Sequence, residues 1–279
     1  MKIDALSDVA GARITGVDLA QQLPVDVFQQ AEQALHTHGF VVFPGQTLSP
    51  QQFMLFSRAW GMAEPHVIDT FHHPDEANIL MLSNVRRDGK PIGLLDAGTY
   101  FHTDYSYLTV PARCTMLYAI QMPRERSGTT FANQTRAYAD LPQATKQQIE
   151  TLVVRHHYGN REDLNVLSRT VASVLSDSQK KKVDWVRHRL VRPHPFTGVP
   201  ALYGVSGSAF GIDGMDDAQG LALLRSLTEH ATAARYCQTY NYTIGDVVVW
   251  DNAQLLHAAP LTQLTDARTL WRITVKEAA

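Results

Sequence analysis

Apolar residues recur at helical spacing near the start of the chain. The segment Pro24–His38 carries four of them on one face: Val25, Phe28, Ala31 and Leu35. This pattern predicts an amphipathic helix, which Gly39 ends. The apolar run Phe40–Phe43 that follows is typical of a strand buried on both faces.

A second helix is expected to begin at Ser49-Pro50. Serine is a favoured N-cap residue, and proline is tolerated at the first helical position because its missing N–H would have no partner there. Apolar side chains then recur on one face, and Gly61 ends the pattern: Phe53, Phe56 and Trp60. The first quarter of the chain therefore predicts two helices around one buried strand, preceded by a short strand at Ala12–Leu19.

The remaining chain has mostly β-type patterning. Short apolar runs typical of strands alternate with Gly-, Pro- and Asp-rich turns: Ile79–Leu82, Cys114–Gln121, Val153–His157, Asp246–Trp250 and Thr269–Val275. Helical patterns cover Thr135–Leu152 and Asp217–Ala233. We therefore expect a mainly β protein, with a double-sheet core and surrounding helices, in which residues 1–279 form a single domain.

One long segment, residues 160–191, is polar and irregular. Ordered loops of that length are uncommon and often act as lids over active sites. The segment is expected to be either such a lid or an ordinary surface insertion.

Composition and charge narrow the classes of partner. The 279 residues are 44% hydrophobic and 19% charged, with a formal net charge of −2. This charge argues against nucleic acid as a partner. No apolar run of about 18 residues exists, so no membrane contact is expected. Cys114 and Cys237 are expected to be reduced thiols rather than a bridge, and we expect a cytoplasmic protein.

The candidate chemistry begins at Phe101-His102-Thr103-Asp104. In an extended backbone alternate side chains share a face, so His102 and Asp104 point to one side. The apolar run Asp246–Trp250 leads, downstream, to His257. Two histidines and one carboxylate are the facial triad of non-haem Fe(II) oxygenases, which leaves positions open for substrate and O₂. The same ligands also suit catalytic zinc.

Two arginines follow His257 within the last predicted strand. Arg268, Leu270 and Arg272 fall on one strand face. Buried arginines are costly unless an anion accompanies them, and a guanidinium binds a carboxylate in a bidentate way. The pair therefore indicates a dicarboxylate ligand, with two surface salt bridges as the alternative.

With these residues, the sequence resembles the taurine dioxygenase / 2,4-dichlorophenoxyacetate dioxygenase (TauD/TfdA) family of 2-oxoglutarate-dependent oxygenases. The resemblance runs over nearly the whole chain, and its segments occur in the family's order: GARITGVDL, HGFVVFPGQTLSPQQFMLFSRAWG, LSNVRRDGK, FHTDYSY, PRERSGTTFANQTRAYADLP, GDVVVWDNAQLLHAAP and ARTLWRITV. It implies a double-stranded β-helix, a cupin-like variant of the jelly roll.

The resemblance also implies roles for single residues. Three of them bind the iron: His102, Asp104 and His257. Arg268, eleven residues after the distal histidine, holds the far carboxylate of 2-oxoglutarate, assisted by Thr130, with Thr129 as the neighbouring alternative.

The resemblance is less specific about the residues that bind the substrate. Arg272 matches a second family arginine that in some members contacts an anionic group of the substrate, and Asn84 lies on a strand beside the pocket. Aromatic and imidazole side chains near the triad are expected either to line the pocket or to belong to the core: Phe71, His72, His73, Phe101, Tyr105 and Tyr107.

The implied reaction uses Fe(II), 2-oxoglutarate and O₂, releases succinate and CO₂, and hydroxylates a small, anionic organic substrate. Asp104 favours hydroxylation, because halogenating relatives have a small residue at that position. Two other functions are compatible with these residues: a zinc-dependent hydrolase, and a catalytically silent jelly-roll protein that binds a small molecule. The family resemblance also makes a homo-oligomer plausible.

Overall fold

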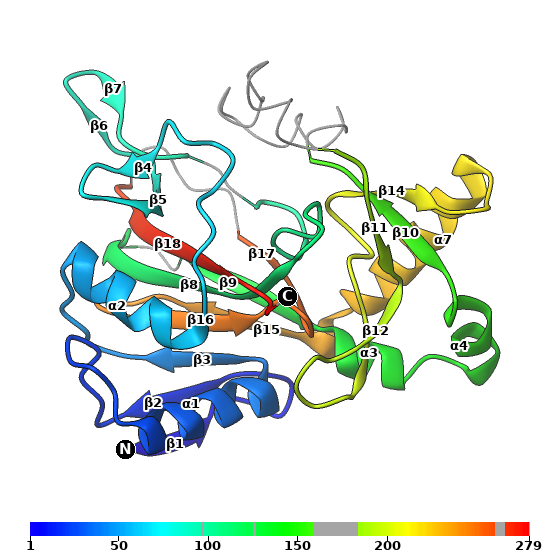
Figure 1. Cartoon of the computed structure of the whole chain (residues 1–279), viewed down its shortest axis with the longest axis horizontal. Coiled ribbons are helices and arrows are strands. Elements are labelled where there is room, and N and C mark those ends of the chain that lie inside the picture. Colours follow the sequence, from blue (N-terminus) through cyan, green and yellow to red (C-terminus); the bar gives the residue numbers. More distant parts are fainter. Residues whose placement is uncertain (96–97, 125–126, 159–183, 260–265, 279) are drawn as a thin grey trace.

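The structure, a computed structural model, describes residues 1–95, 98–124, 127–158, 184–259 and 266–278. Within these ranges its largest sheet has eight strands (Figure 1). In spatial order they are β1 (Lys2–Ala5), β2 (Ala12–Thr15), β3 (Phe40–Phe43), β16 (Val247–Asp251), β8 (Ala112–Gln121), β18 (Thr269–Lys276), β5 (Glu76–Ser83) and β4 (His72–His73). All neighbours are antiparallel except β2 and β3.

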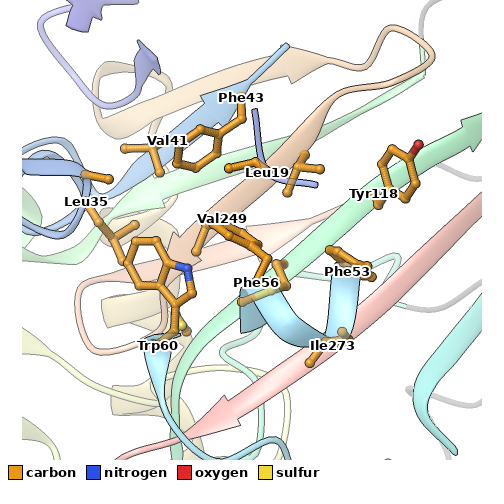
Figure 2. Close-up of a cluster of buried hydrophobic side chains, with 14 of the residues drawn as sticks. Leu19, Leu35, Val41, Phe43, Phe53, Phe56, Trp60, Tyr118, Val249 and Ile273 are labelled. Atoms are coloured by element: carbon orange, nitrogen blue, oxygen red, sulfur yellow. The ribbon is translucent and has the colours of Figure 1, made fainter. Parts of the chain in front are cut away.

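Two helices, α1 (Val25–His38) and α2 (Pro50–Trp60), cover one face of this sheet. α2 begins with a capping box, in which the side chains of Ser49 and Gln52 each accept a hydrogen bond from the other residue's backbone N–H. Figure 2 shows the aromatic side chains of α2 packed over the sheet in a cluster with residues of the strands beneath them. Both helices lie where the apolar pattern predicts them.

A second, smaller sheet packs on the other face. It has the order β15 (Cys237–Asn241), β9 (Gly128–Asn133) and β17 (Leu255–Ala258). Phe131 of β9 stacks on Phe40 of the large sheet, with ring centroids 4.3 Å apart. β3 is buried on both faces, because alternate residues of its apolar run enter the helix-covered cluster and the cluster between the sheets. The mainly β, double-sheet core with external helices is therefore confirmed.

Most of the remaining elements lie beside this sandwich, on the right of Figure 1, whereas the hairpin of β6 (Arg86–Arg87) and β7 (Lys90–Pro91) lies at the upper left near β4 and β5. A three-stranded sheet consists of β11 (Val186–Arg189), β10 (Val153–His156) and β14 (Ala209–Ile212). The other elements are α3 (Gln134–Ala139), α4 (Gln143–Ile149), β12 (Val191–Pro193), β13 (Pro200–Leu202), α7 (Asp217–Ala231) and the 3₁₀ turn η2 (Ala234–Tyr236). No helix in the described ranges is long and apolar enough to cross a membrane.

The structure divides one expected helix in two and describes only part of the segment 160–191. The single helix expected at Thr135–Leu152 is in fact α3 and α4, because Pro142 lacks an N–H to continue the helix and instead precedes α4. Of the expected lid, residues 160–183 lie outside the described residues, while Val186–Arg189 forms β11, paired with β10.

Candidate metal centre and co-substrate pocket

Backbone pairing brings two of the three expected ligands together. His102 and His257, 155 positions apart, form an isolated antiparallel bridge. The His102 N–H donates to the His257 carbonyl at 3.0 Å, and the His257 N–H donates back at 2.8 Å. Residues directly opposite one another in such a bridge point to the same side. The two imidazole rings accordingly lie 4.2 Å apart between centroids.

The carboxylate of Asp104 completes the group. Its Oδ1 lies 3.6 Å from Nε2 of His102, and its Oδ2 lies 3.6 Å from Nε2 of His257. The intervening Thr103 points away, as the alternation predicts, and donates to the Asn252 carbonyl at 2.8 Å. Three ligand atoms within 4.8 Å of one another, two of them from buried residues, can bind one metal ion.

The proton on His102 is placed suitably for metal binding. Its Nδ1 lies 2.8 Å from the carbonyl oxygen of Tyr100, which only accepts, so Nδ1 carries the hydrogen. Nε2 then presents a lone pair towards Asp104. Burial holds the pKa of His257 well below its usual value, so that ring is neutral. The donor set therefore fits a divalent metal with open coordination positions, as in non-haem iron sites.

Asp104 is held from both sides. Its Oδ1 accepts from Arg272 Nη2 at 2.7 Å, and its Oδ2 accepts from Thr115 Oγ1 at 2.6 Å. Burial alone would raise the pKa of this carboxyl group, but the charge of Arg272 holds it well below its usual range. Asp104 is therefore ionised and fixed in orientation.

Asn252 connects the backbone and side chain of this ligand, a role that sequence reasoning missed. Its Oδ1 accepts from the Asp104 N–H at 3.1 Å and from Trp250 Nε1 at 3.2 Å. Its Nδ2 donates to Thr115 Oγ1 at 3.0 Å, and Thr115 in turn donates to Asp104. The signal available in the sequence was the polar Asp251-Asn252 pair directly after the apolar run Val247–Trp250.

Two glycines lie against His102. Gly98 and Gly207 have φ values of 69° and 73°, which glycine adopts without strain. A Cβ at Gly98 would lie 3.2 Å from His102 Nε2 and 2.5 Å from its Cε1, and one at Gly207 would lie 2.7 Å from His102 Cβ. The absence of side chains at both positions makes room for the imidazole.

Of the two candidate threonines, the structure turns Thr129 inward. β9 pairs with β17 in a register that places Phe131 opposite His257, so Thr129 shares the interior face with Phe131. Thr129 is buried, and its hydroxyl lies 2.7 Å from that of Tyr242. Thr130 faces outward and is hydrogen-bonded to Thr239 at 2.8 Å. This placement favours Thr129, the alternative, over Thr130, and the contact of either residue with the co-substrate stays a prediction.

Arg268 is buried immediately before β18, and Asn84 fixes its backbone. The Arg268 N–H donates to Asn84 Oδ1 at 2.8 Å, and Asn84 Nδ2 donates to the Asp266 carbonyl. These contacts make Asn84 a support for the segment that carries Arg268, while a contact of Asn84 with the substrate stays a prediction. Leu270, two residues after Arg268, belongs to the cluster between the two sheets.

Three other residues are expected to bind the substrate: Arg272, Tyr105 and Phe71. Arg272 lies with its Cζ 5.7 Å from the centre of the Tyr105 ring. The Tyr105 and Tyr107 ring centroids are 5.7 Å apart, and those of Tyr107 and Tyr158 are 4.5 Å apart. Tyr105 is buried and donates to the Glu64 carbonyl at 3.0 Å. Phe71 is partly buried against the cluster between the sheets. Arg272 therefore lies among tyrosines and already has an anionic partner in Asp104.

A second group of the same composition, His36, His194 and Asp251, lies elsewhere. Here Nδ1 of His194 accepts from the backbone N–H groups of Phe196 and Thr197, at 3.3 and 3.1 Å. The ring proton is therefore on Nε2, which donates to Asp251 at 2.8 Å. A metal at Nε2 would have to displace that proton, so this group is a hydrogen-bonded support rather than a metal site.

Comparison with known proteins agrees with the site's geometry. Residues 2–274 match the family model described as taurine catabolism dioxygenase TauD, TfdA family. An α-ketoglutarate-dependent 2,4-dichlorophenoxyacetate dioxygenase from Cupriavidus pinatubonensis is 30% identical, over 98% of this chain and 97% of that protein. An (S)-phenoxypropionate/α-ketoglutarate dioxygenase from Delftia acidovorans is 28% identical, over 97% and 93%.

Solved structures show the same fold. AAD-2, crystallised with Mn(II) and N-oxalylglycine, superposes with a TM-score of 0.83 at 27% identity, covering 100% of this chain and 98% of that one. A taurine dioxygenase from Burkholderia xenovorans gives a TM-score of 0.81 at 26% identity, covering 99% and 91%. Neither the zinc-dependent hydrolase nor the silent binding protein finds support in these matches. The chain belongs to the TauD/TfdA family of 2-oxoglutarate (α-ketoglutarate)-dependent dioxygenases.

Proposed function

We propose that this dioxygenase binds Fe(II) through His102, Asp104 and His257 and oxidises a small, monoanionic organic substrate. The observation that carries the metal assignment is the 2.8 Å contact between His102 Nδ1 and the Tyr100 carbonyl, from which we assign the ring proton to Nδ1 and a lone pair to Nε2. When bound, Fe(II) with 2-oxoglutarate and O₂ supplies the oxidising power, and succinate and CO₂ are released.

The co-substrate's far carboxylate is assigned to Arg268 and Thr129. Both side chains are buried, and a buried guanidinium is stabilised by a carboxylate that it can meet in a bidentate way. Thr129 takes the role first given to Thr130, because only Thr129 faces the interior. Asn84 positions Arg268 through the backbone hydrogen bond at 2.8 Å.

The charges of the assembled site support a monoanionic substrate. The charges of Fe(II) and 2-oxoglutarate cancel, and the charge of Asp104 is cancelled by one of the two arginines. Arg268 then meets the far carboxylate of 2-oxoglutarate, while Asp104 also faces the metal, so Arg272 keeps positive charge that a single carboxylate or sulfonate would neutralise in this buried pocket. The tyrosines around Arg272 offer aromatic surface for the body of such an acid. Relatives named for phenoxyacetate and phenoxypropionate compounds agree with an aryloxy carboxylate.

Succinate release tests the substrate assignment. We expect phenoxyacetate-type acids to stimulate succinate release, and their neutral amides not to do so. Arg272→Gln should weaken the effect of the acids by about ten-fold, since charged hydrogen bonds contribute about 1.5–3 kcal/mol. Arg155→Gln is the matched control, because Arg155 lies on β10 and pairs with Asp217 of α7. Equal stimulation by acids and amides would contradict the proposal.

A further inference from the structure

A tyrosine outside the family pattern identified above borders the proposed co-substrate site. Tyr242, directly after β15, is 7% exposed, and its hydroxyl lies 2.7 Å from that of Thr129, which is 2% exposed. The Tyr242 backbone N–H donates to the Ser127 carbonyl at 3.1 Å, which fixes the start of its side chain. The two hydroxyl groups therefore form a buried pair with a defined separation.

Arg268 belongs to the same region. Leu270, two residues after Arg268, packs in the cluster that contains Tyr242. Burial raises the pKa of Tyr242 to about 12, although the nearby charge of Arg268 opposes that rise. Tyr242 is therefore a neutral phenol at physiological pH and has one proton to donate.

The direction of the hydrogen bond follows from counting protons. Each hydroxyl group has one proton, and a carboxylate only accepts hydrogen bonds. If Thr129 donates to the co-substrate's far carboxylate, it cannot also donate to Tyr242. The Tyr242 hydroxyl must then donate to Thr129 Oγ1. The opposite direction would point lone pairs of Thr129 at the carboxylate.

We propose that Tyr242 is a positioning residue for 2-oxoglutarate, which directs the Thr129 hydroxyl proton towards the far carboxylate held by Arg268. The inference rests on the proposed function, because it assumes that Arg268 and Thr129 bind that carboxylate. Tyr242 acts through Thr129 and makes no contact with the metal ligands.

The test is an anaerobic titration of the Fe(II) protein with 2-oxoglutarate, followed by the visible charge-transfer band that chelation produces. Tyr242→Phe should raise the dissociation constant by about five- to ten-fold, the effect of one hydrogen bond. The double variant with Thr129→Val should match Thr129→Val alone, because the two residues act in series. Two controls should leave the constant unchanged: Tyr240→Phe, which removes a hydroxyl bonded to Asp246, and Thr130→Val.

A shorter 2-oxo acid separates positioning from a general structural effect. 2-Oxobutyrate lacks the far carboxylate, so Tyr242→Phe should leave its dissociation constant unchanged. An equal loss for both acids, additive effects in the double variant, or an unchanged constant for 2-oxoglutarate would overturn the inference. If the unsubstituted protein itself shows no band, the proposed function fails instead, so the two failures are distinguishable.

Discussion

The described part of the chain contains two groups of two histidines and one aspartate, and their hydrogen bonds give them different chemistry. In the group of His102, Asp104 and His257, the Tyr100 carbonyl accepts a hydrogen bond from Nδ1 of His102, so the Nε2 lone pair points towards the carboxylate. In the group of His36, His194 and Asp251, two backbone N–H groups donate to Nδ1 of His194, so the ring proton lies on Nε2.

The difference shows that composition and proximity do not define a metal site. Both groups bring three ligand atoms within 4.8 Å of one another. What separates them is the backbone group next to Nδ1, because a carbonyl accepts and an N–H donates. We therefore predict that the first group binds metal and the second stabilises the fold, and the following variants test this contrast in decreasing order of their expected effect on metal affinity.

Removing a ligand should have the largest effect. His257→Ala should weaken binding of Mn(II), measured by calorimetry, by about 100-fold or more, exceeding the loss caused by outer hydrogen-bond partners. His36→Ala, the matched change in the second group, should leave the affinity within about two-fold. Similar losses in the two variants would contradict the assignment of one metal-binding group.

Removing the hydrogen bond from Thr115 to the Asp104 carboxylate should have the next largest effect on metal affinity. Thr115→Val removes the hydroxyl that donates to Asp104 Oδ2 at 2.6 Å while keeping the side-chain shape. Mn(II) affinity should fall by about ten-fold, as for other partners of metal ligands. Thr274→Val, which changes a threonine 3.3 Å from Thr115, provides the control. An unchanged affinity for Thr115→Val would show that Arg272 and Asn252 suffice to orient Asp104.

Crowding the imidazole should have a smaller effect. Gly98→Ala and Gly214→Ala both place an alanine at positive φ, at 69° and 76°, and should each cost about 1 kcal/mol of stability in chemical denaturation. Only the methyl group at residue 98 meets His102, while nothing lies within 4 Å of that at residue 214. We expect a loss of Mn(II) affinity of several-fold for Gly98→Ala alone. Equal affinities would mean that the His102 ring can shift without cost.

Disrupting the second group should scarcely change metal affinity. His194→Ala removes a fully enclosed ring and leaves Asp251 without one donor, so the free energy of unfolding should fall by about 1–3 kcal/mol. Mn(II) affinity should stay within about two-fold. A stable variant with weakened metal binding would reverse the roles given to the two groups.

The sequence predicted the parts of the site that depend on local pattern. The alternation in Phe101-His102-Thr103-Asp104 anticipated that His102 and Asp104 converge while Thr103 points away, and the structure agrees. Ser49-Pro50 likewise marked the start of α2. Such features depend on neighbouring residues, so they can be recognised without the fold.

Features set by long-range pairing could not be predicted in this way. Whether Thr129 or Thr130 faces the pocket depends on the register of β9 against β17, which places Phe131 opposite His257. A shift of one residue would exchange the two threonines. Asn84 meets the backbone before β18 only after the chain has folded, and nothing in LSNV indicates that partner.

The most direct test of the central claim is the visible spectrum of the protein with Fe(II) and 2-oxoglutarate, recorded without oxygen for three forms. We predict a charge-transfer band in the unsubstituted protein and in His194→Ala, and none in His102→Ala. A band that persists in His102→Ala, or one that disappears from folded His194→Ala, would contradict the assignment of the metal to His102, Asp104 and His257.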